Sequence, residues 1–597
     1  MQQKFTTNRL NTCTPVWYNY LISRCFTLLI AESSLNKEVP CFNHYDAIAF
    51  YAETSHILKV QTKRFLFKEA YMIHGTSQEF FNAADYFVDR NIRQGRGHKI
   101  AVYTEFKNYT YNDIQKMTNK TANALRELGV RVDDRVMVLM LDVPQFYAVF
   151  WGIIKIGAVP IPVNTMLTPE DYEYYLNDSR ARVLIVSEQL IQVITHIKGD
   201  LLYLRDLVVI SETEGAHIPF RQKYRHAPAE LKTEFTTKDD VGFWLYSSGS
   251  TGSPKGAIHS QYDMVITSQA FAQGILGLTE NDICFSAARL FFSYGLGNGM
   301  YFPMSVGGAA VLSSHSPTPE NVFKHLERFR PTIFFGVPTL YGQMLEHKAH
   351  QDRAAGITPD PNANHELSSV RICVSAGEAL PTELFYRWKD RFGIEIIDGI
   401  GSTEMLHIFL SNRPGDIKPG STGKPVPGYE LKLLDEDGQQ EVPKGEIGTL
   451  HVKGNSAAQQ YWKKREKTRL TMQGEWINTG DKYYVDEDGY YWCAGRGDDM
   501  LKVGGIWVSP VEVENCLSKH PAVFECAVVG NADKDGLVKP KAFVVLREGF
   551  SSSEELAQEL KQWTLDRLAK FKYPRWVEFV EQLPKSSTGK IQRFKLR

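Results

Sequence analysis

Between residues 82 and 186 the hydrophobic positions follow two alternating periods. Apolar residues recur at helical spacing in 83–90 and 111–128, whereas 100–103 and 135–139 are short apolar runs of strand length. Glycine and proline separate these segments. Alternating helices and strands of this kind are typical of a parallel sheet that is covered by helices on both faces. The pattern therefore predicts an α/β fold.

The same alternation continues in the middle of the chain. Residues 262–276 have the pattern of an amphipathic helix, and 371–381 predict a strand that runs through a glycine turn into a helix. Residues 394–405 repeat that shape, so both turns should place backbone N–H groups at the carboxyl ends of strands, where open α/β sheets bind ligands. The polar stretch 351–366, with two prolines, predicts a surface loop.

The last third of the chain predicts two smaller units. Short strands punctuated by Pro and Gly in 421–452 indicate a small β subdomain. A compact α+β unit follows, with helices at 510–518 and 553–569 and strands at 525–529, 541–546 and 577–579. We therefore expect a large N-terminal domain of several subdomains with doubly covered sheets (72–497) and a smaller, mobile C-terminal domain (498–597).

Residues 1–71 show neither a clear helical nor a clear strand period, and the pattern becomes regular only after Met72. They are expected to form a poorly ordered, dispensable extension, or to reflect a start codon upstream of Met72. Arg24 interrupts the apolar run 20–30, which argues against a secretory signal.

Length and composition narrow the functional classes. A chain of 597 residues with 43% hydrophobic content exceeds one ordinary domain. Its net charge of −1 gives no global attraction to nucleic acid or to a membrane surface. The apolar stretch 146–163 contains Lys155, two glycines and two prolines, so a buried helix followed by a strand is favoured over a membrane span. Monomer and homodimer both remain open.

Cysteine usage points to a reducing compartment. The eight cysteines have neither CxxC nor Cys/His metal spacing, so packing roles are favoured over disulfides or zinc. A cytoplasmic protein without a structural metal is expected.

The strongest chemical motif is YSSGSTGSPKG, from Tyr246 to Gly256, which follows an apolar run and precedes a helical pattern. Its glycines allow backbone N–H groups to converge on one point, its hydroxyls add donors, and Lys255 adds a point charge, as a polyphosphate requires. It is not the P-loop of NTPases, because Pro254 replaces the second Gly and no Ser or Thr follows Lys255. A flexible Ser/Gly linker is the simpler alternative.

This loop, together with DGIGSTE, NTGD, GRGDDMLKVGG and the terminal PKSSTGKI, resembles the adenylate-forming superfamily of acyl-CoA synthetases, luciferases and adenylation domains. LFFSYGLGNG, SAGEALP, STGKPVPGYE and KYPRWVEFVEQLP resemble the benzoate-CoA ligase family within it. The resemblance covers residues 82–597. It implies activation of a benzoate, hydroxybenzoate or aminobenzoate with ATP, CoA and Mg²⁺ through an acyl-adenylate.

The resemblance also implies roles for individual residues. The 246–256 loop would hold the β- and γ-phosphates, Thr403 would reach the α-phosphate, and Glu404 would bind Mg²⁺. Catalytic roles fall to Lys590, Thr403, Glu404 and Lys255. The ATP- and AMP-binding set is Ser247, Ser248, Gly249, Ser250, Thr251, Gly252, Lys255, Ser375, Ala376, Gly377, Glu378, Asp398, Gly399, Ile400, Gly401, Ser402, Thr403, Asp481, Arg496, Lys502 and Lys590.

In the resemblance, Ser375 to Glu378 flank the adenine, Asp398 and Gly399 face its amino edge, and Asp481 fits the ribose hydroxyls. Lys590 would bridge the substrate carboxylate and the α-phosphate during adenylation only. A hinge at Asp498 would then rotate the small domain and bring Gly504 and Gly505 against the site for CoA.

The resemblance implies a short, flat pocket for the acid's ring, lined by Phe292, Ser293, Tyr294, Ala376, Gly401, His407 and Ile408. Ser293 departs from the Ala associated with benzoate-preferring members, so its hydroxyl would either favour a ring hydroxyl or amino group or bond to backbone. No Asp or Glu lies between Phe285 and Phe302 to pair with an amino-acid ammonium group. The rivals are a medium-chain fatty acyl-CoA synthetase and an inactive nucleotide-binding protein.

Overall fold

A nine-stranded sheet is the largest sheet in the part of the chain that the structure describes. Its inner neighbours, from β1 to β13, are parallel, whereas β2, β14 and β15 join antiparallel at the two edges. In spatial order its strands are β15 (Lys424–Pro425), β14 (Ile408–Ser411), β13 (Ile396–Gly401), β12 (Ile372–Ser375), β11 (Ile333–Gly336), β9 (Ile283–Ser286), β10 (Ala309–Val311), β1 (Ile100–Tyr103) and β2 (Tyr109–Thr110).

The computed structural model describes residues 79–597, except 198, 211–222, 248–252, 357–366, 504–505, 534–536 and 586–590. The predicted extension 1–71 therefore lies outside the described residues. Within them, no helix is both long and apolar enough to span a bilayer.

Two further sheets belong to the large domain. A parallel sheet has the order β4 (Val159–Pro162), β3 (Arg135–Leu139), β5 (Val183–Ser187) and β6 (Asp206–Ile210). All five residues of β5 are buried, because helices and the neighbouring sheet cover both faces. An antiparallel sheet has the order β18 (Gln460–Tyr461), β8 (Lys255–Ser260) and β7 (Val241–Ser247).

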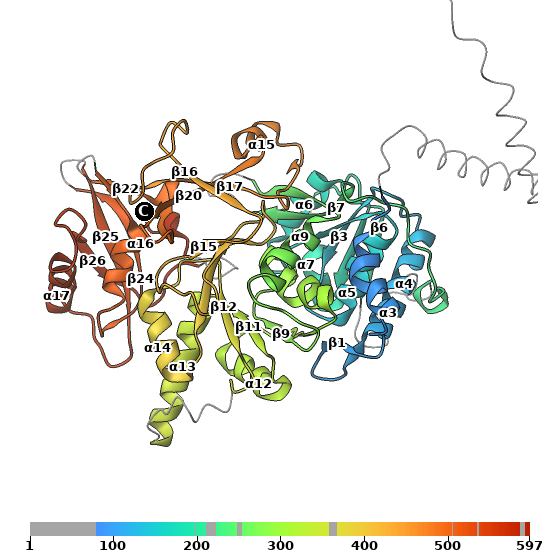
Figure 1. Cartoon of the computed structure of the whole chain (residues 1–597), viewed down its shortest axis with the longest axis horizontal. Coiled ribbons are helices and arrows are strands. Elements are labelled where there is room, and N and C mark those ends of the chain that lie inside the picture. Colours follow the sequence, from blue (N-terminus) through green and yellow to red (C-terminus); the bar gives the residue numbers. More distant parts are fainter. Residues whose placement is uncertain are drawn as a thin grey trace, which may run out of the picture. The chain divides into compact units, whose positions relative to one another are not determined.

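Helices connect these strands (Figure 1). Thr110 caps the long helix α4. Its side chain accepts a hydrogen bond from the backbone N–H of Asp113, and the Asp113 carboxylate accepts one from the backbone N–H of Thr110, so two otherwise unpaired donors are satisfied. In Figure 1, α13 and α14 lie side by side. The helices are η1 (Asp85–Asp89), α3 (Arg90–Arg93), α4 (Tyr111–Glu127), α5 (Pro144–Lys155), α6 (Pro169–Ser179), η2 (Glu188–Leu190), α7 (Ile191–Thr195), α9 (Asp263–Thr267), η3 (Ser268–Gln273), α10 (Ser293–Leu296), η4 (Gly297–Tyr301), α11 (Phe302–Val306), α12 (Pro319–Phe329), α13 (Pro338–Ala355) and α14 (Thr382–Phe392).

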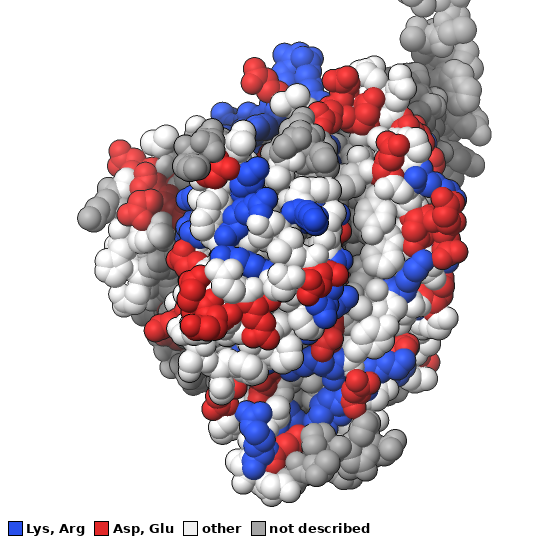
Figure 2. All heavy atoms as spheres, turned by 90° about the vertical axis from the view of Figure 1, so that its left-hand side faces the viewer, with Lys and Arg blue, Asp and Glu red and all other residues white. Residues whose placement is uncertain are grey.

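The predicted β subdomain and α+β unit are both present. The first contains β16 (Glu430–Leu434), β17 (Gly448–Lys453), α15 (Arg465–Thr471), β19 (Met472–Gln473), β20 (Trp476–Val485) and β21 (Tyr491–Arg496). The second contains η6 (Gly497–Asp499), β22 (Leu501–Val503), β23 (Ile506–Val508), α16 (Pro510–Leu517), β24 (Val523–Ala532), β25 (Val538–Leu546), α17 (Glu554–Leu565), β26 (Trp576–Phe579) and η7 (Arg593–Lys595). Figure 2 shows basic and acidic side chains in alternating small groups on one face, in keeping with 68 basic and 69 acidic residues.

Three local predictions were wrong. The phosphate loop is followed by strand β8, which pairs antiparallel with β7, and not directly by a helix. Residues 394–405 form β13 and a turn that leads into strand β14, so they do not repeat the strand-to-helix shape of 371–381. Residues 351–355 continue helix α13, because its C-terminal Gly356 at φ 65° ends the helix later than the polar composition suggested.

Candidate active site

The parallel pairing of β12 with β13 ends at Ser375, the last residue of β12, and Asp398 lies opposite it in register on β13. Both side chains are buried, and Ser375 Oγ and Asp398 Oδ1 have no hydrogen-bond partner within the described residues. Burial raises the pKa of Asp398 well above its ordinary value, despite hydrogen bonds from the Leu380 and Gly399 backbone. Buried polar atoms without partners are rare in folded proteins. The amino edge of an adenine would supply the missing donor, so these residues fit the nucleotide base.

Glu378 connects the same strand end to the C-terminal segment. The preceding Gly377 has φ 98°, a conformation that L side chains rarely adopt. Glu378 Oε1 accepts a hydrogen bond from the backbone N–H of Ile591 at 3.0 Å, and its Oε2 accepts one from Thr339 Oγ1 at 3.5 Å. Lys590, which precedes Ile591, lies outside the described residues.

The turn between β13 and β14 carries Thr403 and Glu404. Ser402 Oγ accepts a hydrogen bond from the backbone N–H of Met405 at 3.1 Å. The fully buried His259 ring lies 2.8 Å from the carbonyl oxygen of Thr403 through Nε2 and 2.8 Å from Asp263 Oδ2 through Nδ1. These contacts fix the turn from two sides. His259 was missed by the sequence analysis, although its i,i+4 spacing to Asp263 was visible.

Glu404 lies in a cluster that we call the phosphate edge, formed by Ser247, Lys255, Glu404 and Tyr461. The Tyr461 hydroxyl donates to Glu404 Oε1 at 2.6 Å, and Ser247 Oγ donates to the same oxygen at 3.3 Å. Lys255 Nζ lies 3.4 Å from the Tyr461 hydroxyl and 4.5 Å from its ring centroid.

Burial shifts the pKa of two side chains of the phosphate edge, Tyr461 and Lys255. Burial, followed by the negative charge of Glu404, raises the pKa of Tyr461 far above its ordinary value, so the phenol stays a donor. Burial lowers the pKa of Lys255, and the Glu404 carboxylate partly opposes that shift. The predicted residues Ser248, Gly249, Ser250, Thr251 and Gly252 lie outside the described residues.

The donor set fits magnesium carried by a nucleotide. Among the described residues no group of three or more His, Cys, Asp and Glu side chains could hold a metal alone. Mg²⁺ instead uses one or two carboxylates together with substrate phosphates and water. A single accessible carboxylate, Glu404, beside a phosphate loop meets that requirement.

Asp481 and Arg496 form a second charged pair on neighbouring strands. They lie opposite each other in the β20–β21 ladder, and Arg496 Nη1 is 3.2 Å from Asp481 Oδ1. The Asp481 side chain is 13% exposed and the Arg496 side chain is 54% exposed, so the pair can reach a ligand from solvent. The side chain of Lys502, and residues Gly504 and Gly505, lie outside the described residues.

Aromatic rings surround His407, and we call the group Phe271, Tyr294, Phe302 and His407 the acid pocket. The His407 ring centroid lies 4.4 Å from that of Phe302 and 5.6 Å from those of Phe271 and Tyr294. His407 Nε2 donates to the carbonyl oxygen of Tyr294 at 3.3 Å, and burial lowers the pKa of His407 to about 3. The ring is therefore neutral. Phe271 and Phe302 were missed, because they reach His407 only through tertiary packing.

The other predicted pocket residues lie on adjoining backbone. Ser293 begins α10 directly after Phe292, so it immediately precedes Tyr294. Gly401 ends β13 opposite Ile408, and a Cβ at Gly401 would meet the His407 carbonyl oxygen at 2.5 Å. Glycine is therefore required there by a close backbone approach. Ala376, Gly399 and Ile400 lie on the same two strand ends, β12 and β13.

The predicted hinge residue Asp498 lies in η6, next to a set of ion pairs from the C-terminal segment. Arg593 Nη2 donates to both carboxylate oxygens of Glu514, at 2.9 and 2.8 Å. Arg593 Nη1 is 3.8 Å from Asp499, and Arg597 Nη2 donates to the Asp498 carbonyl oxygen at 2.9 Å. The segment that follows Lys590 is thus bound to the predicted hinge.

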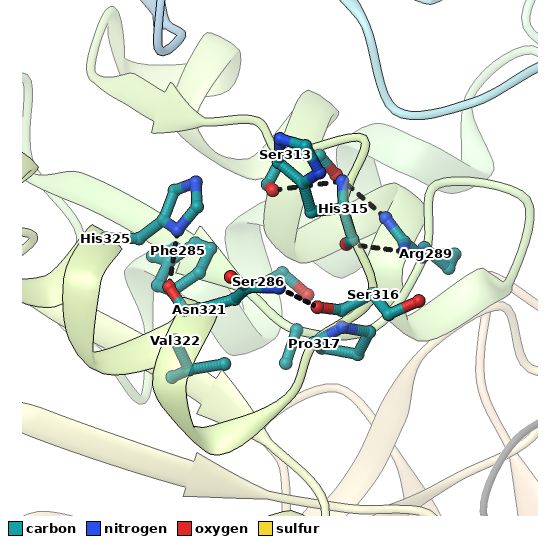
Figure 3. A pocket seen from close by; sticks show the side chains of 11 residues that line it. Phe285, Ser286, Arg289, Ser313, His315, Ser316, Pro317, Asn321, Val322 and His325 are labelled. Carbon is teal, nitrogen blue, oxygen red and sulfur yellow. Dashed lines mark hydrogen bonds between the residues drawn. The ribbon is translucent and has the colours of Figure 1, made fainter.

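A hollow of about 250 Å³, open solvent included, lies beside the ends of β9 and β10 (Figure 3). Arg289 donates to the carbonyl oxygens of Ser313 and His315 at 2.8 and 2.7 Å. His325 Nδ1 lies 2.5 Å from the carbonyl oxygen of Asn321. Its polar groups bond to one another, and none of the predicted site residues line it.

Buried polar groups, one carboxylate and an aromatic cluster thus gather near the carboxyl ends of parallel strands, where open α/β sheets bind their ligands. Residues 88–462 match the family model "AMP-binding enzyme", and 512–590 match "AMP-binding enzyme C-terminal domain". The chain belongs to the AMP-binding enzyme family.

Two curated relatives are similar over most of the chain. Benzoate–CoA ligase of Thauera aromatica is 50% identical over 87% of this chain and 96% of its own length. The 4-hydroxybenzoate–CoA/benzoate–CoA ligase of Rhodopseudomonas palustris is 42% identical over 87% of this chain and 94% of its own.

Two solved structures are also similar, each at 47% identity. The anthranilate CoA ligase AuaEII in complex with anthranoyl-AMP superposes with a TM-score of 0.81 over 87% of this chain and 96% of that one. A benzoate CoA ligase of Burkholderia xenovorans LB400 superposes with a TM-score of 0.78 over 87% of this chain and 100% of that one. The predicted superfamily and the large-plus-small domain fold are therefore confirmed.

Proposed function

We propose that this enzyme converts benzoate, or a hydroxy- or aminobenzoate, into its CoA thioester with ATP, releasing AMP and pyrophosphate. The observation that carries the proposal is the acid pocket. Its buried rings pack directly against His407 and form an uncharged aromatic surface, which is suited to stack against the ring of an aromatic acid. The relatives named for benzoate, hydroxybenzoate and anthranilate support the same class of acid.

The chemistry has two steps because a carboxylate oxygen is a poor leaving group. Attack of the carboxylate on the α-phosphorus of ATP forms the aroyl-adenylate and releases pyrophosphate. The CoA thiol then attacks the carbonyl carbon and releases AMP. In both steps the protein mainly positions the reactants and stabilises developing charge.

We assign the residues as follows. Ser375 and Asp398 receive the adenine edge, Asp481 and Arg496 the ribose and phosphates, and Thr403 the α-phosphate. Magnesium, when bound with ATP, neutralises charge on the phosphate oxygens. Glu404 holds it, and Lys255 faces the departing pyrophosphate.

The small-domain residues complete the assignment. Lys590 bridges the acid and the α-phosphate during adenylation, and the contact of its neighbour Ile591 with Glu378 supports a place for this segment at the nucleotide. A rotation at Asp498 would then bring Gly504 and Gly505 to the site for CoA.

Ser293 bears on which ring is preferred. It begins α10 between Phe292 and Tyr294, and this place beside a ring of the acid pocket supports an interaction of its hydroxyl with a ring substituent. The five cysteines in the described residues are free, which supports action in a reducing cytoplasm.

The test is a pyrophosphate-release assay with ATP, Mg²⁺ and CoA on five acids: benzoate, 4-hydroxybenzoate, 3-hydroxybenzoate, 2-aminobenzoate and hexanoate. Thioester formation is measured in parallel by the mass of the product. We expect an aromatic acid to give the highest kcat/KM. Highest activity with hexanoate, or pyrophosphate release from none of the acids, would contradict the proposal.

A further inference from the structure

Tyr461 reaches the phosphate edge from a strand that no motif marks. Strand β18 pairs with β8 as Tyr461↔Ala257, and the backbone N–H of Trp462 donates to the carbonyl oxygen of Gly256 at 2.8 Å. The strand that leaves the phosphate loop therefore has Tyr461 attached directly alongside it. Because backbone pairing fixes this register, the position of the Tyr461 ring is set by the sheet and not by a loop.

The Tyr461 side chain has little freedom. It is 2% exposed and packs against Ala257 and Ala458 in a small apolar cluster. A buried ring held on a strand loses almost no further entropy when its hydroxyl makes a hydrogen bond. Tyr461 is thus a preorganised donor, and its hydroxyl points at Glu404.

Both hydrogen bonds to the Glu404 carboxylate within the described part of the chain go to the same oxygen. Oε1 accepts from Tyr461 at 2.6 Å and from Ser247 at 3.3 Å. A hydrogen bond to a charged acceptor is short and strong, so it selects one rotamer of an otherwise flexible side chain. Both of these bonds therefore leave the lone pairs of Oε2 for another partner.

We propose that Tyr461 is a positioning residue, which holds the Glu404 carboxylate so that Oε2 binds the Mg²⁺ of Mg·ATP. The proposal rests on the proposed function for the identity of the metal–nucleotide complex. Lys255 Nζ donates to the same hydroxyl at 3.4 Å, so Tyr461 is a hydrogen-bond partner of both the ammonium group and the carboxylate.

The experiment compares Tyr461→Phe with Tyr490→Phe, which removes a tyrosine–carboxylate hydrogen bond, to Asp416, outside the phosphate edge. The dissociation constant of ATP is measured by calorimetry with Mg²⁺ and again with EDTA. Tyr461→Phe should weaken binding about tenfold with Mg²⁺ and leave binding with EDTA unchanged, because a carboxylate that is no longer held in orientation costs affinity only where it must bind a cation. Tyr490→Phe should change neither constant.

A second measurement reports on the metal directly. With Mn²⁺ in place of Mg²⁺, the electron paramagnetic resonance spectrum of enzyme-bound Mn·ATP should broaden or shift in Tyr461→Phe and not in Tyr490→Phe. Both ATP dissociation constants, with Mg²⁺ and with EDTA, are measured on the same variant. Partial unfolding would weaken both and would not produce an effect limited to Mg²⁺. Equal weakening with Mg²⁺ and with EDTA, or no weakening, would overturn the proposal.

A double-mutant cycle tests whether Tyr461 acts through Glu404. In Glu404→Gln, adding Tyr461→Phe should produce less than a twofold further change in Mg·ATP binding, since the two residues act as a unit. A full tenfold further loss would contradict positioning. Thioester formation by the wild type tests the proposed function separately. If no thioester forms but the Mg²⁺-specific effect of Tyr461→Phe persists, the proposed function fails and the role of Tyr461 stands. If the thioester forms but the Mg²⁺-specific effect is absent, only the role of Tyr461 is overturned.

Discussion

The phosphate edge and the acid pocket each include one residue of the turn between β13 and β14, Glu404 and His407, but the two groups differ in how they treat charge. In the phosphate edge, Lys255 and Glu404 are half-buried, and Tyr461 lies between them as a shared hydrogen-bond partner. In the acid pocket, His407 is 2% exposed and its pKa is lowered to about 3, so no charge remains. Under the proposed assignment, the enzyme therefore binds ATP with balanced charges and selects the acid with an uncharged aromatic wall.

The largest expected effect comes from removing the charge of Lys590, which is proposed to contact both the acid and the α-phosphate. Lys590→Ala should slow aroyl-adenylate formation by about 10²- to 10³-fold or more, because a positioned charge is lost in the transition state. Reaction of CoA with supplied aroyl-AMP should stay near normal. Single-turnover assays of each half-reaction measure the difference.

Lys595→Ala, in η7, is the matched control, since it removes an exposed lysine from the same tail. It should behave as wild type in both half-reactions. Equal losses in the two half-reactions of Lys590→Ala would mean that the lysine does not act in adenylation alone.

A change confined to the acid pocket should leave ATP binding intact. A Cβ at Gly297 would lie 2.6 Å from His407 Cδ2, so Gly297→Ala should push the His407 ring towards the substrate. We expect KM for benzoate to rise about 10- to 100-fold, as overpacking by 1–3 kcal/mol implies, with KM for ATP unchanged. Gly342→Ala, a helical glycine with open space around it, is the control. A parallel rise in both KM values would break the distinction between the two regions.

The neutral state of His407 predicts a dependence of stability on pH. As the pH falls below about 6.5, the unfolded chain binds a proton at His407 and the folded protein, with its pKa of about 3, does not. Acidification from pH 7 to pH 5 should therefore cost about 2 kcal/mol at this residue. Urea unfolding of His407→Gln should show that much less acid destabilisation than wild type, whereas His315→Gln, at an exposed histidine, should not. An identical pH dependence in wild type and His407→Gln would contradict burial of a neutral ring.

The smallest effect sharpens the acid ranking. Ser293→Ala should lower kcat/KM for a hydroxy- or aminobenzoate about 3- to 10-fold relative to benzoate, because a neutral hydrogen bond contributes about 1 kcal/mol. Ser369→Ala, which removes a hydroxyl that donates to the carbonyl oxygen of Pro331, is the control. An unchanged ranking would remove Ser293 from the pocket but leave the ligase assignment standing.

Much of the fold follows from the sequence because local periodicity and burial agree. The strand at 135–139 and the helix that starts at Tyr111 lie where their patterns predict them. The prediction failed after Thr403, where the chain continues as strand β14 and not as a helix. Here Leu406 takes φ 67° and the fully buried run from Ile408 pairs across to β13, so tertiary pairing overrides the analogy with the preceding glycine turn.

In the candidate site, too, residues within motifs were predictable and residues brought in by tertiary packing were not. Thr403, Glu404, Lys255 and Asp398 were predictable because motifs keep them at fixed spacing near strand ends. Tyr461 was not, because it lies 57 residues from Glu404 and belongs to no motif. Phe271 and Phe302 likewise reach His407 from separate helices, η3 and α11, and a single sequence contains no signal of that packing.

The ion pairs of Arg593 give the tail a mechanical consequence. Arg593 lies three residues after Lys590 and is joined to helix α16 through Glu514 and to η6 through Asp499. Under the proposed rotation, Lys590 would move together with the small domain that contains α16. The same movement would withdraw Lys590 and admit the CoA thiol. Adenylation would therefore have to precede thioester formation.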